Sequence, residues 1–189
     1  MQVVASIRPG RTPCTGAPLW FAAVEVEEAI RRRRTLKAFR PEEIPEATVR
    51  ELLELGVLAP NHHLTEPWRF WVLGPETLAK LVEATGDVKL TRSQTAVLVG
   101  ITGAADEKEA EEDYAAAACA IQTMMLAARG RGLASYWRTP GVFARPAFRE
   151  TVGVGDDVRL VGLMHVGWPA EDFPEAPRRH AGHLTQWLP

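Results

Sequence analysis

A long helical segment without a polar face limits most strongly what this chain can fold into. Apolar spacing predicts a helix over residues 110–129, and from Ala115 to Ala128 apolar side chains occupy nearly every side of it. A helix that is apolar all round has to be buried on several sides. We therefore expect it at the centre of the domain or at an interface between subunits, with Cys119 as a small buried thiol.

Short helices and short strands surround this segment. Helical spacing of apolar residues predicts further helices over residues 26–34, 47–58, 76–84 and 145–152. Aromatic and β-branched runs bounded by turns predict strands over residues 70–73, 96–101, 135–138 and 159–166, of which 96–101 is apolar enough for a central strand. We expect one α+β domain over residues 24–189, after a loose arm over residues 1–23 where prolines and glycines interrupt any period.

Composition narrows the class of protein. A length of 189 residues suits one domain, and a net charge of −2 gives no overall basic field for nucleic acid or anionic lipid. Cys14 and Cys119, the chain's two cysteines, cannot build a disulfide framework or a four-thiolate zinc site. No apolar stretch approaches the roughly 20 residues of a membrane span, and no signal-peptide pattern opens the chain. We expect a cytoplasmic protein.

A basic segment ends the first predicted helix. Arg31–Arg34 are followed by Thr35 and Lys37, where the helix gives way to extended chain. Cations at a helix C-terminus complement its dipole and can simply be solvated. The added hydroxyl and cation also suit a small anionic ligand, because arginine binds phosphate bidentately. The residues alone leave both interpretations open, whereas a nucleic-acid site is disfavoured because aromatic residues do not interleave the run.

Two further segments could contribute to a site. Residues 59–67 form a polar loop between two prolines, and its adjacent His62 and His63 have no cysteine or carboxylate at metal-ligand spacing, so we expect no metal. The Gly-x-Gly at residues 130–132 follows a helix rather than a strand, which favours a helix cap over a dinucleotide-binding turn. The strand after it ends in Trp137 and Arg138, which could lie beside a flat ring.

Taken in order, these segments resemble the nitroreductase (flavin reductase-like) family. Residues 33–39 (RRTLKAF) match its R-[RH]-[ST]-x-[RK]-x-F motif at every position. Residues 59–62 (APNH) lead into 66–70 (EPWRF), as the family's [SA]-P loop leads into Q-P-W-[HR]-F. A Trp-Arg strand follows the long helix, and residues 161–169 look like the last core strand with its Gly-x-Pro ending. The likeness covers about residues 26–188.

The resemblance implies a nitroreductase-like fold, a central, mostly antiparallel sheet flanked by helices in an intertwined homodimer. It also implies FMN held between the two subunits, with NAD(P)H as co-substrate. Arg33 and either Arg178 or Arg179 would bind the phosphate, Thr35 and Lys37 the pyrimidine edge, and His62 would come from the second subunit. The residues that the resemblance assigns to the cofactor are Arg33, Arg34, Thr35, Lys37, His62, Tyr136, Trp137, Arg138, Arg178 and Arg179.

The expected activity is hydride transfer from NAD(P)H through the flavin, in ping-pong order, to a small electron-poor acceptor such as a nitroaromatic or a quinone. No residue is a dedicated catalytic acid; Lys37 would tune the reduced flavin. The chain departs from the family at Glu66, where glutamine is usual, because an ionised carboxylate donates no hydrogen bond and repels an anionic flavin. This departure keeps open a non-catalytic flavin-binding protein.

Overall fold

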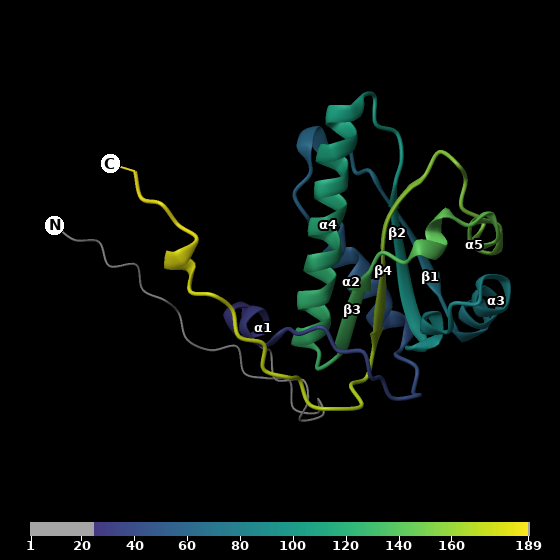
Figure 1. Ribbon diagram of the computed structural model, residues 1–189, viewed down its shortest axis with the longest axis horizontal. Helices are drawn as coiled ribbons and strands as arrows, with labels where there is room; N and C mark the ends of the chain where they lie inside the picture. The colour runs from purple at the N-terminus through teal and green to yellow at the C-terminus, as the bar shows by residue number, and fades with distance from the viewer. Residues whose placement is uncertain (1–24, 189) are drawn as a thin grey trace.

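The computed structural model describes residues 25–188, and the predicted N-terminal arm over residues 1–23 lies outside them. Its centre is a sheet of four strands in the order β1-β2-β4-β3, and every neighbouring pair is antiparallel (Figure 1). The strands are β1 (Trp68–Leu73), β2 (Thr95–Ile101), β3 (Ala134–Arg138) and β4 (Arg159–Gly167). The predicted antiparallel α+β sheet is therefore confirmed.

The central position of β2 follows from its sequence. Every residue of β2 is buried, because helices cover both faces of the sheet and strands flank both edges of β2. Alternation along the strand sends Val97 and Val99 into one apolar core and Ala96 and Leu98 into the other. The sheet is thus the middle layer of three.

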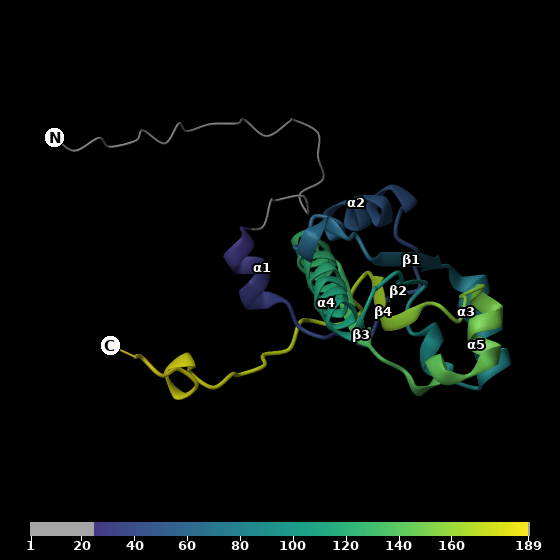
Figure 2. The ribbon, with the colours of Figure 1, turned by 90° about the horizontal axis from the view of Figure 1, so that it is seen from above.

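Helices form the two outer layers, as the view from above shows (Figure 2). Helices α2 and α4 cover one face, and α3 and α5 cover the other, while α1 lies beside α4. Among residues 25–188, no helix is long and apolar enough to cross a lipid bilayer. The helices are α1 (Val26–Arg32), α2 (Glu46–Gly56), α3 (Pro75–Thr85), α4 (Glu107–Gly130) and α5 (Pro146–Val152).

Helix α4 is the long helix that the apolar pattern predicted. It begins at Glu107, three residues before the predicted start, because the Asp106 side chain caps it by accepting a hydrogen bond from the Glu109 N–H at 2.8 Å. One side of α4 is buried against the sheet and α2. The outer side is not: Ala115, Cys119 and Gln122 are exposed. The prediction of a buried Cys119 is therefore wrong for the single chain, because no described element covers this side.

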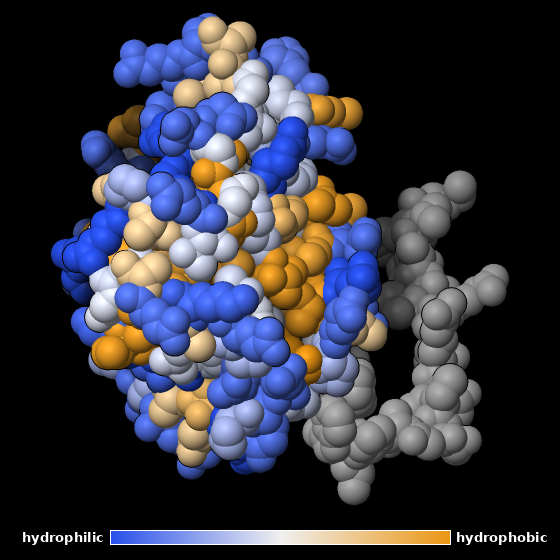
Figure 3. Space-filling view, turned by 90° about the vertical axis from the view of Figure 1, so that its right-hand side faces the viewer, coloured by the Kyte–Doolittle hydropathy of each residue, from blue (hydrophilic) through white to orange (hydrophobic). Residues whose placement is uncertain are grey.

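Apolar surface also remains on the side of the molecule where β1 forms the sheet edge. A groove lies between α2 and β1, and Val72 in it is 49% exposed. Figure 3, which views the molecule from the side of α3 and α5, shows an apolar area among polar ones. The apolar residues that line the groove are Ile44, Val49, Leu53 and Val72.

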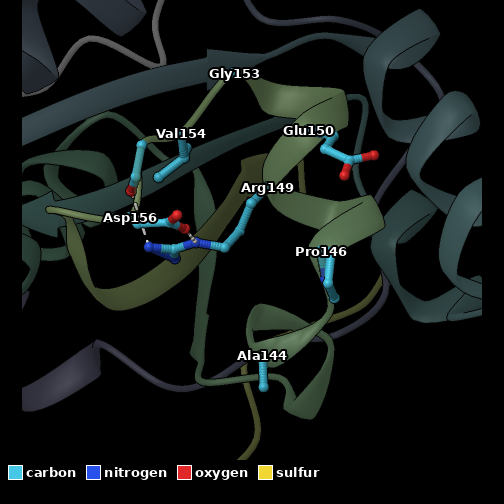
Figure 4. Close-up of a pocket in the computed structure, with 8 residues that line it drawn as sticks. Ala144, Pro146, Arg149, Glu150, Gly153, Val154 and Asp156 are labelled. Atoms are coloured by element: carbon cyan, nitrogen blue, oxygen red, sulfur yellow. Dashed lines mark hydrogen bonds and ion pairs between the residues drawn. The ribbon is translucent and has the colours of Figure 1, made fainter.

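A hollow beside α5 lies where Arg149 holds the loop that follows this helix. Arg149 points from α5 toward the loop that follows the helix (Figure 4). Its Nη2 donates to the carbonyls of Gly155 at 2.9 Å and Val158 at 2.8 Å. Its Nε lies 3.7 Å from an Asp156 carboxylate oxygen. These bonds tie the loop to α5, on the side of the molecule away from α1 and the basic segment (Figure 1).

Candidate functional site

The basic segment is fixed against the edge of the sheet. Thr35 pairs in parallel with Ser135 of β3 as an isolated bridge, and the Leu36 N–H donates to the Ser135 carbonyl at 3.4 Å. Leu36 is buried, which anchors the segment, and its neighbours Thr35 and Lys37 are exposed. Because alternate residues of an extended chain share a side, the hydroxyl and the ammonium face the same way.

The C-terminal tail adds a second cation near Arg33. The pKa of Arg33 is lowered, first by burial and then by the positive charges of Arg34 and Arg178. Within residues 25–188 neither Arg33 nor Arg178 forms an ion pair with a carboxylate. Like charges that converge without a counter-ion favour an anion between them. Of the two predicted tail arginines, Arg178 is thus the one whose charge acts on Arg33, and Arg179 is exposed.

Arg34 points to the other side of the segment. Its Nη1 donates to the carbonyls of Arg31 at 2.7 Å and Arg33 at 2.8 Å, so the guanidinium closes the end of α1. It lines a hollow together with Arg129, whose guanidinium lies 4.3 Å from the centre of the Phe173 ring. Burial and then the charge of Arg32 lower the pKa of Arg129. Arg34 is therefore used chiefly to hold the backbone that presents Arg33.

Tyr136 is the centre of a second group of cations. The Lys37 Nζ lies 5.3 Å from the centre of the Tyr136 ring, and the Arg92 guanidinium carbon lies 5.8 Å from it, within the range of a cation–π interaction. The His165 ring is stacked at 5.8 Å from the same ring. Sequence reasoning found Lys37 and Tyr136 but missed Arg92, which lies in a connection without a distinctive motif.

His165 is a fully buried neutral side chain below Tyr136. The Ser93 hydroxyl donates to the Thr95 carbonyl at 2.6 Å, so its oxygen accepts from His165 Nδ1 at 2.9 Å. Within the described residues, the buried Nε2 has no hydrogen-bond partner. Burial first, and then the charges of Arg138 and Arg92, lower the pKa of His165 from 6.5 to about 4. The imidazole therefore adds no charge to the site at neutral pH.

The strand residues predicted to lie beside the flavin are divided between the two faces of the sheet. Trp137 packs into the core on the α4 face, whereas Tyr136 and Arg138 face the other side. The Arg138 Nη2 lies 2.6 Å from an Asp87 carboxylate oxygen, and both side chains are mostly buried. Burial, the largest single influence, would raise the pKa of Asp87, but the hydrogen bonds from the Arg138 side chain and the Lys89 N–H, together with the charges of both residues, lower it. The charge of Arg138 is thus already compensated.

The loop before β1 has an unusual backbone. His63, Leu64 and Glu66 have φ angles of 53°, 54° and 45°, in the left-handed region that residues other than glycine rarely adopt. Each such residue costs about 1–3 kcal/mol and persists only where its surroundings hold it. Part of that hold is internal, because Asn61 Oδ1 accepts from the Glu66 N–H at 3.0 Å. The exposed Glu66 side chain extends from this loop.

Two carboxylates at the N-terminal end of α4 hold the same loop. His62 Nδ1 lies 2.7 Å from Glu112 Oε2, and the Thr65 hydroxyl donates to Asp113 Oδ1 at 2.8 Å. Asp113 is only 3% exposed. The hydrogen bond with His62 lowers the pKa of Glu112. The sequence analysis did not identify either carboxylate as a site residue, although two adjacent acidic residues on a largely apolar helix could have indicated a role.

Within one chain, the loop and the basic segment lie at opposite ends of α4. The loop contacts its N-terminal end and α1 lies beside its C-terminal end (Figure 1). The 17 residues from Glu112 to Arg129 span about 26 Å at about 1.5 Å per residue. A single chain therefore does not bring His62 together with Arg33, Thr35 and Lys37.

Comparison with known proteins places these features in a family. The model of the nitroreductase family matches residues 30–102 and 89–168, most of the chain. The chain belongs to the nitroreductase family. The fold agrees with this assignment: the crystal structure of a nitroreductase-like family protein from Bacillus cereus superposes with a TM-score of 0.79 at 24% identity, over 87% of this chain and 96% of that one.

Two other nitroreductase relatives extend the comparison. "Putative NAD(P)H nitroreductase YfhC" of Bacillus subtilis strain 168 is 27% identical over 173 residues, covering 82% of this chain and 89% of its own length. A variant of the FMN- and NADPH-dependent nitroreductase NfnB from Sphigopyxis sp. strain HMH superposes with a TM-score of 0.77 at 17% identity, over 88% of this chain and 100% of that one. The likeness spans nearly the whole length of each relative.

Proposed function

We propose that this nitroreductase-family chain is an FMN-dependent NAD(P)H oxidoreductase that reduces small electron-poor acceptors such as nitroaromatics or quinones. The observation that supports this most is the segment anchored to the edge of β3, which presents Thr35 and Lys37 on one side, next to Arg33, on which the charge of Arg178 also acts. The names of the relatives support the same chemistry, since one is an NAD(P)H nitroreductase by name and another depends on FMN and NADPH.

The residues present fit FMN. Burial first, and then the charges of Arg34 and Arg178, lower the pKa of Arg33, and a phosphate bound beside it would offset both effects. Thr35 and Lys37, on the same side of the extended segment, would meet the polar edge of the ring. When bound, FMN supplies the hydride chemistry, taking a hydride from NAD(P)H and passing reducing equivalents to the acceptor. Lys37 would stabilise negative charge that develops at the pyrimidine edge on reduction.

Two copies of the chain would complete the site. The outer side of α4 is exposed and largely apolar, with Ala115, Cys119 and Gln122 along it. If two α4 helices pack antiparallel through this side, the loop of each chain lies opposite the basic segment of the other. His62 would then reach the FMN held by the partner. Three apolar tail residues that a second chain could also cover are Leu184, Trp187 and Leu188, exposed by 66%, 89% and 78%.

An absorbance spectrum and an FMN titration of the purified protein test the cofactor. We expect flavin bands, or saturable binding of added FMN; a colourless protein that binds no FMN would contradict the proposal. Turnover is tested by NAD(P)H oxidation with a nitroaromatic acceptor, and FMN binding without turnover would favour the non-catalytic alternative.

Replacement of Lys37 tests its assigned role. Lys37→Ala should slow reduction of the flavin by NAD(P)H more than it weakens FMN binding, because the charge it stabilises appears only on reduction. The matched control is Lys80→Ala, an exposed lysine on α3 that should change neither quantity. Equal losses in binding and reduction for Lys37→Ala would refute the role.

A further inference from the structure

The loop over residues 61–66 is held from one direction by α4. Its three left-handed residues, His63, Leu64 and Glu66, keep the backbone in a conformation that an unrestrained loop would leave. Two adjacent carboxylates of α4, Glu112 and Asp113, restrain its side chains from outside the loop, and the Arg69 Nη1 donates to the Glu66 carbonyl at 3.4 Å. The loop is therefore shaped before any ligand or second chain arrives.

The burial of the Asp113 carboxylate is unfavourable for folding. A carboxylate buried on the apolar side of a helix loses its hydration, and hydrogen bonds must offset that loss. In the described part of the chain it has no ion-pair partner, and the Thr65 hydroxyl, at 2.8 Å, is its side-chain hydrogen-bond donor. A leucine or alanine would suit a core helix better for stability alone. The position of Asp113 is explained by what it holds.

Glu112 determines how the His62 ring is presented. Hydrogen bonding to His62 lowers the pKa of this carboxyl, so it is ionised and can only accept. His62 Nδ1 must then carry the proton, and Nε2, across the ring, points away from α4 as the free nitrogen. His62 remains 54% exposed while it makes this bond, and Lys108, 3.6 Å from the other Glu112 oxygen, holds the carboxylate from the opposite side.

We propose that Glu112 and Asp113 are positioning residues that preset the 61–66 loop, so that His62 Nε2 meets the FMN bound by the partner chain. Asp113 fixes the backbone through Thr65, and Glu112 fixes the ring tautomer and its direction. This inference rests on the proposed function and deepens it. It adds two residues that act on the cofactor through the loop without touching it.

The first test removes the hydroxyl that Asp113 holds. Thr65→Val leaves the core of α4 unchanged, and Thr65→Ser restores the hydroxyl. Because a hydrogen bond to a charged group is worth roughly ten- to hundredfold in an equilibrium constant, we expect Thr65→Val to weaken FMN binding by about that factor and Thr65→Ser to bind like wild type. Asp113→Asn, which keeps an acceptor oxygen, should lose less than Asp113→Ala.

The second test measures the tautomer of the His62 imidazole directly. In the apo protein, nitrogen NMR should show His62 protonated at Nδ1 when neutral, and Glu112→Ala should shift it toward the Nε2-protonated form. The matched control is Glu111→Ala, an adjacent exposed carboxylate whose partner is Arg159 at 2.7 Å. It should change neither the tautomer nor FMN affinity.

The outcomes separate the two proposals. If wild type binds no FMN, the proposed function fails and this inference fails with it. If wild type binds FMN while Thr65→Val and Asp113→Ala bind equally well, only the positioning role is overturned. If Thr65→Val weakens binding and Thr65→Ser weakens it as much, the role is also overturned, because the effect would not come from the hydroxyl.

Discussion

Acid should destabilise this protein through one buried side chain, His165. Its pKa is 6.5 in an unfolded chain and about 4 in the folded state. Above pH 6.5 both states hold the imidazole neutral, and the group contributes nothing to the pH dependence of stability. As the pH falls from 6.5 to 4 the unfolded state takes up a proton that the folded state does not, at about 1.4 kcal/mol per pH step. The free energy of unfolding should therefore fall by about 3 kcal/mol over that interval.

His165→Leu isolates this contribution from that of other acid-sensitive groups. The substitution removes the titrating ring and fills a similar volume, and Ser93 keeps its bond to the Thr95 carbonyl. At pH 7 we expect the variant to lie within about 1.5 kcal/mol of wild type. Between pH 7 and pH 4 the free energy of unfolding of the variant should rise by about 3 kcal/mol relative to that of wild type.

The assay is urea denaturation followed by tryptophan fluorescence at pH 7, 6, 5 and 4. His63→Gln is the control, because His63 is exposed and its replacement should leave the wild-type pH dependence in place. If wild type and His165→Leu lose stability in parallel as the pH falls, the buried neutral imidazole is not the origin of the acid sensitivity.

Three further substitutions test packing, electrostatics and assembly. Gly162→Ala should cost about 1–3 kcal/mol in urea denaturation, since a Cβ there would lie 2.6 Å from Trp137 Cδ1; an unchanged midpoint would contradict the packing. Arg138→Leu should cost about 3 kcal/mol in the same assay because it leaves Asp87 mostly buried without its cation, and Asp87→Asn should reduce that loss in the double variant. Cys119→Arg should turn a dimer into single chains of 20.8 kDa in sedimentation; a stable dimer would show that α4 pairs elsewhere.

The elements could be predicted because each depends on local spacing. Within residues 25–188, helical periods found all five α-helices, and short apolar runs bounded by turns found all four strands. The start of α4 was missed because the helix begins at the Asp106 cap, before the first residue of the apolar pattern from which the helix was predicted. The buried Cys119 was mispredicted because apolar composition shows that a side needs a cover without showing whether the same chain supplies it.

The site was harder to predict because it depends on contacts between distant segments. Nothing in the sequence couples Arg138 to Asp87, which is 51 residues away, or Thr65 to Asp113, 48 residues away. The placement of Tyr136 and Trp137 on opposite faces of the sheet could have been predicted, because successive side chains of a strand point to opposite faces. The resemblance supplied the candidate residues in the basic segment, and the structure then showed that the Arg138 charge is compensated and that the charge of Arg178 acts on Arg33.

The placement of Glu112 and Arg129 on one unbroken helix makes α4 a spacer of fixed pitch. Inserting a single residue between them would lengthen the helix by only about 1.5 Å but would rotate one end against the other by about 100°. The loop and the basic segment would then face different directions, while the sheet could remain intact. An insertion of seven residues, close to two turns and about 10.5 Å, would instead restore the relative direction of the two ends to within about 20°.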